Sequence, residues 1–278
     1  MIRMISILAG LFFTVALGWA LILGGMGVMH DGIPTSVEKQ FHKHPKELSL
    51  ASDGAFGKFD RAQLQRGFQV YKEVCSNCHA MKYVAFRDLT ALGYNEDEVK
   101  AVAKGYKVPA FNPATGEAKS HDGTPADHFP PVVYAGQGNP PDLSLITKAR
   151  HGGAAYVYSL LTGYANQAGY KNEAGVELLK AFPDAKTPAG LYFNPYFANL
   201  NVAMPPPLTS DGQVSYKDGT KASVDQMAQD VSAFLVWTAE PKLEKRHQTG
   251  WAVLGFLLFA TTLAYMAYRN VWADKKGH

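Results

Sequence analysis

The 278-residue sequence predicts a mostly α-helical protein, with one polar domain at residues 30–249 between two apolar segments. Two observations predict this class. Apolar residues recur at helical spacing in several stretches of the central region, and none of its stretches shows a convincing ladder of alternating strands. The apolar segments at both ends are long enough to cross a bilayer as helices, which needs about 20 residues.

The first apolar segment, residues 1–29, has a single basic residue, Arg3, ahead of an almost unbroken apolar run. This pattern resembles a secretory signal, but the run is longer than the usual h-region of about 7–15 residues. Gly18-Trp19-Ala20 is also a poor match to a cleavage site. The segment is therefore predicted to be either a signal sequence or an N-terminal transmembrane helix, and in both cases it exports the domain that follows.

The central domain contains several stretches with helical periodicity. The clearest runs from Arg61 to Val74, with Asp60 as its N-cap and with Leu64, Phe68 and Tyr71 on one apolar face. Residues 81–92 continue with apolar periodicity, and further helices are predicted at 96–102, 154–162, 171–182 and 224–238. Residues 106–137, rich in Gly, Pro and Asp, are expected as one long loop, and residues 183–207 as an irregular, proline-rich segment.

The second apolar segment, residues 250–272, is predicted to be a transmembrane anchor. Pro241 ends the preceding helix. Trp251 and Trp272 lie near the two ends of the apolar run, as expected for aromatic belts at membrane interfaces. Arg269 and the lysines of the tail, residues 273–278, favour a cytoplasmic C-terminus by the positive-inside rule.

The charge of the central domain excludes one class of partner. Residues 30–249 contain equal numbers of basic and acidic side chains, because the excess of the whole chain, +3, comes from the two ends. A nucleic-acid-binding domain is expected to be basic, with clustered Lys and Arg. The sequence therefore predicts no nucleic-acid partner.

Cys75-Ser76-Asn77-Cys78-His79 contains the only two cysteines of the chain. Cys-x-x-Cys-His is the spacing at which two thiols attach a haem covalently while the histidine binds its iron. A thioredoxin-like pair would be expected near a strand, but the preceding segment is a predicted helix. A structural zinc site needs four ligands, and a plain disulfide would leave His79 without a role. The motif therefore predicts one covalent haem c, held by Cys75 and Cys78, with His79 as an iron ligand.

A haem built for electron transfer usually has a second protein ligand, and a methionine thioether is a common choice. Met81 is tethered too close to His79, and Met227 lies on the apolar face of a predicted helix, where methionine is more often part of the core. Met204 lies in a loop whose next three residues are prolines, so its backbone is fixed. Met204 is therefore the predicted second ligand.

Nine stretches of the sequence match one known family: residues 57–60, 67–71, 74–79, 140–144, 149–153, 156–164, 203–205, 225–227 and 237–242. Together they resemble the cytochrome c1 family over nearly the whole chain after Phe56. The resemblance implies a class I-type cytochrome c domain with long loops, and it supports His79 and Met204 as metal ligands. It also implies that Arg150 lies near a haem propionate and that Pro141 and Tyr156 line the haem pocket.

The resemblance implies the electron-transfer subunit of a respiratory or photosynthetic bc1 complex, the ubiquinol–cytochrome c oxidoreductase, with no acid–base or nucleophilic residue of its own. Its implied partners are cytochrome b, the Rieske iron–sulfur protein, a soluble or tethered cytochrome c and membrane lipid, in a dimeric complex. The implied location is the inner membrane of a bacterium, with the haem domain in the periplasm. A free-standing membrane-anchored cytochrome shuttle and a haem-based sensor are the alternatives.

Two further features bear on the resemblance. Many bacterial relatives carry an added cysteine pair near the haem, whereas this chain has no cysteine after Cys78. The segment from Pro188 to Leu200 must therefore hold its shape without a disulfide, as in the mitochondrial pattern.

The acidic run Glu96-Asp97-Glu98 is a candidate docking patch for a basic cytochrome c, although such a run at a helix start is more often a cap.

Overall fold

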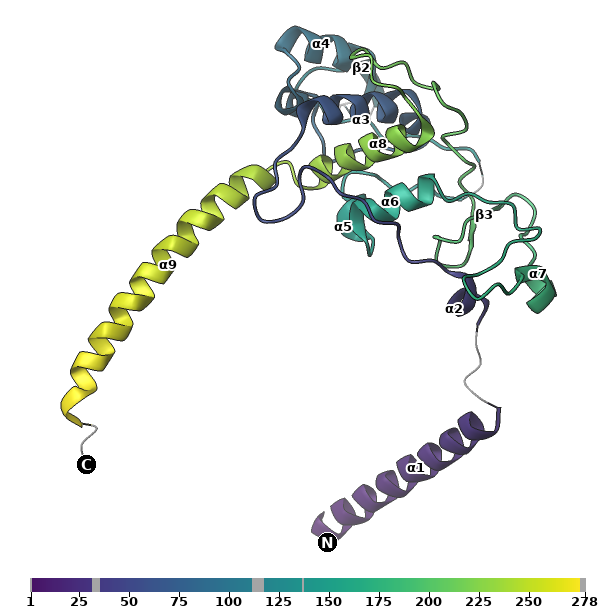
Figure 1. The fold of residues 1–278 in the computed structure, drawn as a ribbon, viewed down its shortest axis with the longest axis vertical. Helices are drawn as coiled ribbons and strands as arrows, with labels where there is room; N and C mark the ends of the chain where they lie inside the picture. Colours follow the sequence, from purple (N-terminus) through teal and green to yellow (C-terminus); the bar gives the residue numbers. More distant parts are fainter. Residues whose placement is uncertain (1, 32–35, 112–117, 137, 276–278) are drawn as a thin grey trace.

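The computed structural model describes residues 2–31, 36–111, 118–136 and 138–275, and it is mostly helical, as the sequence predicts (Figure 1). The elements, in chain order, are α1 (Ile2–Asp31), α2 (Val37–Phe41), α3 (Arg61–Glu73), η1 (Cys75–Asn77), η2 (Phe86–Leu92), α4 (Glu96–Lys104), β1 (Lys107–Phe111), β2 (Ala118–Asp122), α5 (Ile146–Ala149), α6 (Gly153–Leu161), α7 (Leu178–Ala181), η3 (Pro183–Ala185), β3 (Tyr192–Phe193), β4 (Asn201–Val202), α8 (Val224–Ala239), α9 (Leu243–Trp272) and η4 (Ala273–Lys275). The η elements are 3-10 turns.

Helices α3 and α8 form the central packing unit of the domain. Asp60 caps α3 as predicted, because its carboxylate accepts hydrogen bonds from the amides of Ala62 and Gln63 at 3.0 and 3.2 Å. Gly67 lies where the two helices meet, and a Cβ built on it would lie 2.0 Å from the carbonyl oxygen of Asp230. The missing side chain of Gly67 therefore allows the two helix backbones to approach this closely.

The predicted apolar face of α3 packs into an aromatic core. Phe68 and Tyr71 are almost fully buried, and both contact Phe234 of α8 with ring centroids 5.6 and 5.9 Å apart. Phe129 packs edge-on against the rings of Phe68 and Tyr71, with centroids 6.2 and 5.9 Å apart. Leu64 is buried in the same core cluster. Each such side chain contributes about 1.5–3 kcal/mol by its burial. This core fixes the end of α3 from which the Cys-x-x-Cys-His motif begins.

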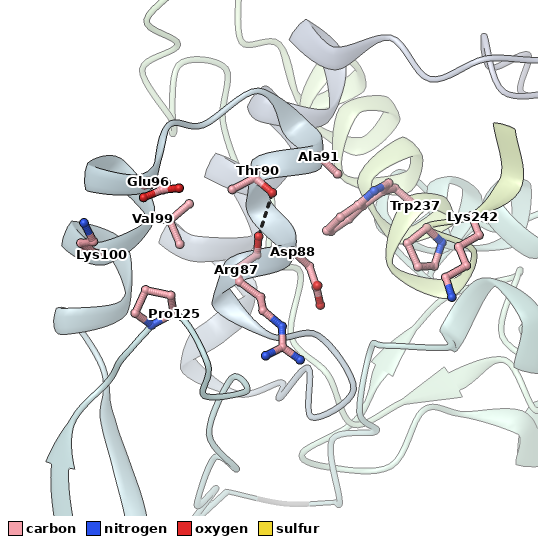
Figure 2. A pocket seen from close by; sticks show the side chains of 11 residues that line it. Arg87, Asp88, Thr90, Ala91, Glu96, Val99, Lys100, Pro125, Trp237 and Lys242 are labelled. Carbon is pink, nitrogen blue, oxygen red and sulfur yellow. Dashed lines mark hydrogen bonds between the residues drawn. The ribbon is translucent and has the colours of Figure 1, made fainter. Parts of the chain in front are cut away.

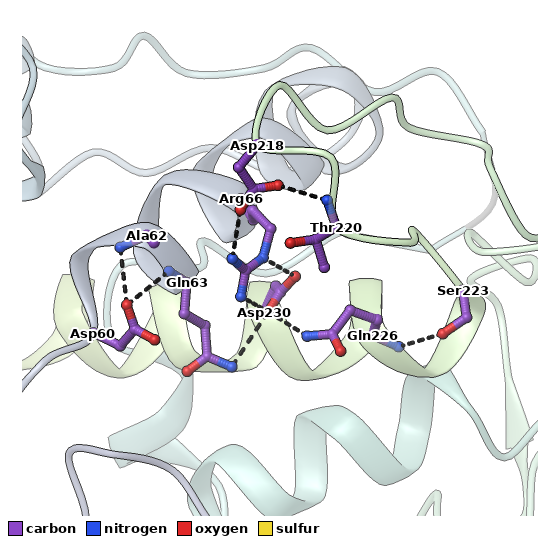
Figure 3. Close-up of polar contacts among 9 residues, drawn as sticks. All are labelled: Asp60, Ala62, Gln63, Arg66, Asp218, Thr220, Ser223, Gln226 and Asp230. Atoms are coloured by element: carbon purple, nitrogen blue, oxygen red, sulfur yellow. Dashed lines mark hydrogen bonds and ion pairs between the residues drawn. The ribbon is translucent and has the colours of Figure 1, made fainter.

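A polar cluster ties α3 to α8 beside this core (Figure 3). Asp230 is fully buried, and the guanidinium of Arg66 binds it through Nε and Nη2 at 2.9 and 3.3 Å. Gln63 and Gln226 donate to its Oδ1 at 3.2 and 2.9 Å, and Arg66 also donates to Asp218 at 2.8 Å. A buried carboxylate costs several kcal/mol to desolvate unless it is paired. The hydrogen bonds of the cluster offset this desolvation cost, and they fix the orientation of α3 relative to α8.

The domain contains two short strand pairs that the sequence does not reveal. Strands β1 and β2 pair antiparallel inside residues 106–137, which the sequence predicts to be one loop. Residues 112–117 and 137 of that range lie outside the described part of the chain. Strands β3 and β4 form a second antiparallel pair of only two residues each. Both pairs are short, and β1 contains Pro109, a residue that argues against a strand in the sequence, so the alternation that marks a strand has too few residues to be recognised.

Three predicted helices have different bounds in the structure. Of residues 171–182, only α7 is helical, because Lys171 pairs with Glu177 in an antiparallel bridge before it. Of residues 81–92, the last seven form the 3-10 turn η2. The last long helix, α9, begins at Leu243 and not at residue 250, because the chain becomes helical again two residues after Pro241.

The two apolar helices extend away from the domain, and the two chain termini lie on the same side of it (Figure 1). Each contains a candidate membrane span, Met4–Leu23 in α1 and Leu243–Trp272 in α9, and the rest of the chain buries no part of the apolar window in either. Both helices are therefore long enough and apolar enough to cross a membrane.

Candidate functional site

The Cys-x-x-Cys-His motif forms a tight turn directly after α3. The backbone amides of Cys78 and His79 both donate to the carbonyl oxygen of Cys75, at 3.1 and 2.9 Å. Both thiols are free and partly buried. Burial, with a smaller contribution from the neighbouring Cys78, raises the pKa of Cys75 to about 12. The turn therefore presents two thiols and one imidazole from five consecutive residues.

The His79 ring is oriented by a backbone carbonyl. Its Nδ1 lies 2.8 Å from the oxygen of Pro141. A carbonyl oxygen can only accept, so Nδ1 must carry the proton and Nε2 of the neutral ring keeps a free lone pair. Burial lowers the pKa of His79, and the bond to Pro141 partly opposes that shift. A metal-binding histidine typically has this arrangement, with one nitrogen donating to a fixed acceptor and the other free to bind.

The segment that carries Pro141 is fixed against the residues that follow His79. Asp142 accepts hydrogen bonds from the backbone amides of Lys82 and Ser144 at 2.8 and 3.0 Å. The amide of Tyr83 donates to the Ser144 hydroxyl at 3.1 Å. The carbonyl of Pro141 is therefore a fixed acceptor and not the tip of a loose loop.

Met204 follows β4 and is half-buried, and the hydroxyl of Tyr164 donates to its carbonyl oxygen at 2.9 Å. The neighbouring Ala203 lies against the loop that leads to Pro141, because a Cβ built on Gly138 would come within 3.1 Å of the Ala203 Cβ. The loop at residues 138–141 therefore contacts both the segment of the predicted second ligand and the ring of His79.

The segment before Met204 holds its shape through a small second core and one buried amide. Leu178, Phe193 and Leu200 form this core together with Phe41. Asn194 is fully buried, and its side chain donates to the carbonyl of Leu160 at 2.8 Å and accepts from the amide of Tyr196 at 3.1 Å. These contacts stabilise residues 188–200, which the sequence expects to hold their shape without a disulfide.

Arg150 and Tyr156 lie on the Met204 side of the site. Arg150 is exposed at the end of α5, and its side chain has no hydrogen bond or ion pair to any described residue. Burial raises the pKa of Tyr156, and the charge of Arg150 partly opposes that shift. Tyr156 in turn helps to raise the pKa of Tyr164, for which burial is the main cause. Tyr156 therefore lies within electrostatic range of both Arg150 and Tyr164.

The structure brings His79 and Pro141 into direct contact. No hydrogen bond or ion pair among the described residues joins the motif to Met204 or Arg150, so their roles as second ligand and propionate partner stay predictions. Met81 and Met227 are fully buried in the core, as expected for methionines that are not ligands. Two residues that the sequence reasoning missed are Tyr71 and Tyr164, whose hydroxyls bind the carbonyl oxygens of His79 and Met204, at 3.0 and 2.9 Å.

Two other surfaces lie apart from the Cys-x-x-Cys-His turn. A cavity of about 700 Å³ opens between η2, α4 and the turn that joins α8 to α9 (Figure 2). Its lining mixes charges of both signs, including Arg87, Glu96 and Lys242, and contains none of the predicted haem residues.

The second surface is the acidic run at the start of α4. Glu98 accepts a hydrogen bond from the amide of Asn95 at 2.8 Å, and Asp97 forms an ion pair with Lys100 at 3.1 Å. Both residues therefore have a local role in capping and pairing α4.

Comparison with known proteins identifies a matching family and several relatives. A family model described as the Cytochrome C1 family matches residues 50–275. The chain is 42% identical over 274 residues to cytochrome c1 of Rhodospirillum rubrum, covering 92% of this chain and 97% of the relative. It is 42% identical over 237 residues to cytochrome b/c1 of Bradyrhizobium diazoefficiens, covering 80% of this chain and 34% of that longer relative. It is also 38% identical over 241 residues to the mitochondrial cytochrome b-c1 complex catalytic subunit of Candida albicans, covering 84% and 79%.

Proposed function

Because the chain belongs to the cytochrome c1 family, we propose that it is the haem-c electron-transfer subunit of a ubiquinol–cytochrome c oxidoreductase, the bc1 complex. In this role it takes one electron from the Rieske iron–sulfur protein and passes it to a soluble or tethered cytochrome c. Relatives named cytochrome b/c1 and cytochrome b-c1 complex catalytic subunit support cytochrome b as its neighbour. No comparison favours a free-standing shuttle.

The observation that carries this proposal is the state of the His79 ring. Its Nδ1 proton is held by the Pro141 carbonyl at 2.8 Å, so Nε2 is free to bind iron. The two thiols of the same turn are free, as attachment of a haem requires. The donor set of two thiols, one oriented imidazole and one loop methionine fits a covalent haem c. A bound haem would supply a one-electron redox centre at this turn.

The other site residues have supporting roles in this proposal. Met204 completes the ligand set from a backbone that three prolines and the Tyr164 hydroxyl hold in place. The exposed guanidinium of Arg150, with no partner among the described residues, is available for a haem propionate. Pro141 and Tyr156 line the pocket. The chain uses no acid–base or nucleophilic side chain, because its task is to position a redox centre between two partners.

The membrane arrangement follows from the two apolar helices. The ends of α1 and α9 that lie away from the domain carry Arg3 and Arg269, and Lys275 follows α9. By the positive-inside rule, the C-terminal end lies in the cytoplasm and the haem domain in the periplasm of a bacterial inner membrane. The first segment, residues 1–29, exports the domain either as a signal sequence or as a second transmembrane helix. Lipid surrounds the spans, and the complex is expected to be dimeric.

The test is a redox difference spectrum, with pyridine haemochrome, of the complex purified through this chain in mild detergent. The expected result is a haem-c band that co-purifies with b-type haem and with antimycin-sensitive quinol oxidation. A Cys75→Ser, Cys78→Ser double variant serves as the control, because it removes both attachment points and should lose the covalent haem. A haem-c band without b-type haem would identify a free-standing carrier, and absence of haem would contradict both functions.

A further inference from the structure

The position of α9 in a membrane can be worked out from its length and its aromatic residues. Trp251 and Trp272 are separated by about 32 Å at 1.5 Å per residue. The hydrocarbon core of a bilayer is about 30 Å thick. No charged side chain lies between Trp251 and Tyr268. Trp251 therefore lies at the membrane interface on the side of the domain.

A loop of the domain, residues 55–59, is hydrogen-bonded to the face of α9 that contains Trp251. Three hydrogen bonds join them: Trp251 Nε1 donates to Ala55 O at 3.1 Å, His247 Nδ1 donates to Gly57 O at 3.3 Å, and Phe59 N donates to Glu244 Oε1 at 2.8 Å. A Cβ built on Gly57 would lie 2.1 Å from the Ser52 carbonyl oxygen. The loop is thus tightly folded as well as fastened, and it keeps a fixed level along α9.

Phe56, at the tip of this loop, lies at the level of the interface. Its ring stacks on Trp251, with centroids 4.7 Å apart and planes 4° from parallel. The Phe56 side chain is nevertheless 77% exposed, because none of the residues that the structure describes covers its outer face. Lys58 and Lys245 are exposed on the same loop and helix, and long side chains of this kind can extend their ammonium groups to the polar side of a membrane interface.

We propose that the 55–59 loop is a second membrane contact of the domain, in which Phe56 enters the lipid interface beside Trp251. An aromatic ring is favoured at this level, as the aromatic belts of membrane proteins show. The domain then meets the membrane through the loop as well as through α9, so its height and tilt above the bilayer are fixed. The inference requires that α9 crosses a membrane, and it does not depend on the proposed electron-transfer role.

The chain offers a direct way to test this contact. Its two cysteines are both expected to be bound to haem, so Phe56→Cys would add the only free thiol of the chain. A nitroxide attached there reports its surroundings by its accessibility to oxygen, which concentrates in lipid, and to a water-soluble nickel chelate. The labelled chain would be purified with its haem and its partners and reconstituted in vesicles of phosphatidylethanolamine and phosphatidylglycerol. The unmodified complex, labelled in the same way, gives the background to subtract.

Ser210→Cys is the matched control, because Ser210 is exposed and lies at the far end of α8. Its neighbour Asp211 accepts from the amide of Val224, the first residue of α8, at 2.9 Å. The 16 residues of α8 separate this end from α9 by about 24 Å. Haem content, measured by pyridine haemochrome, confirms that both variants fold.

The expected result is a ratio of oxygen to nickel accessibility that is several-fold higher at position 56 than at position 210. Equal ratios at the two positions would place the loop in water and overturn the proposal. Protection of position 56 from both reagents would also overturn it, because it would show that a partner protein covers Phe56 in place of lipid.

Discussion

Replacing Tyr164 by phenylalanine tests how the proposed second ligand is held. The hydroxyl of Tyr164 donates to the carbonyl oxygen of Met204 at 2.9 Å, and both residues are half-buried. Tyr164→Phe keeps the ring and removes only this donor. The Met204 carbonyl then loses its partner, so the backbone that presents the thioether is free to move away from the iron.

The size of the effect follows from the loss of one hydrogen bond between neutral groups, which contributes about 1 kcal/mol. That free energy corresponds to about a five-fold shift in the equilibrium between closed and open iron. We therefore expect Tyr164→Phe to keep its covalent haem, to weaken the long-wavelength absorption band of methionine-ligated ferric haem, and to bind carbon monoxide measurably. Met204→Leu, in which the iron is fully open, gives the upper limit of both signals.

Tyr71→Phe is the matched control for this experiment. Its hydroxyl binds the carbonyl of the other proposed ligand, His79, at 3.0 Å. The His79 ring is still oriented by Pro141 in this variant, so we expect the methionine band and the resistance to carbon monoxide to be unchanged. Wild-type values in Tyr164→Phe for both readouts would refute the reasoning.

Three other changes have defined outcomes. Met204→Leu should leave the haem attached but lower its reduction potential in a redox titration, and an unaltered potential would show that another residue is the ligand. Asp230→Asn should lower the free energy of unfolding by about 3–5 kcal/mol, since it leaves the charge of Arg66 partly buried without its main partner; urea denaturation at neutral pH measures this. The amide of Thr220 and the guanidinium of Arg66 hold the pKa of Asp218 below its usual value, so the stability from this carboxylate is present above its unfolded pKa of about 3.9 and is lost as the pH falls through the lower folded value. Asp218→Asn should therefore flatten the decline of stability below about pH 4, and a decline as steep as in the wild type would contradict the assignment.

The features that the sequence predicted correctly are local. The Asp60 cap, the apolar face of α3 and the position of Cys75 directly after that helical stretch each depend on residues within a few positions of one another. Sequence spacing reports such arrangements directly. The same locality explains why two methionines could be set aside as ligands: Met81 is only two residues from His79, and Met227 lies in a stretch whose periodicity marks it as core.

The features that the sequence did not predict depend on backbone acceptors far along the chain. Pro141 binds the His79 ring through its carbonyl oxygen, and Tyr71 and Tyr164 bind the carbonyl oxygens of the two proposed ligands. Every residue has a carbonyl, so its use as an acceptor leaves no signature in the residue type. A tyrosine in an apolar stretch is equally expected in a core without such a role.

The two proposed ligands are supported by different parts of the fold. His79 is attached to the main core through Tyr71, which packs against Phe129 and Phe234. Met204 follows a segment that is held by the second, smaller core around Leu200. The loop at residues 138–141 contacts both sides, so movement of either core would change the distance between the ligands. Electron transfer is served by a site whose ligands stay in place, because a preorganised site needs little rearrangement. The hydrogen bonds to backbone carbonyls provide this rigidity on both sides, and they explain how the proposed second ligand can be kept in position without a disulfide.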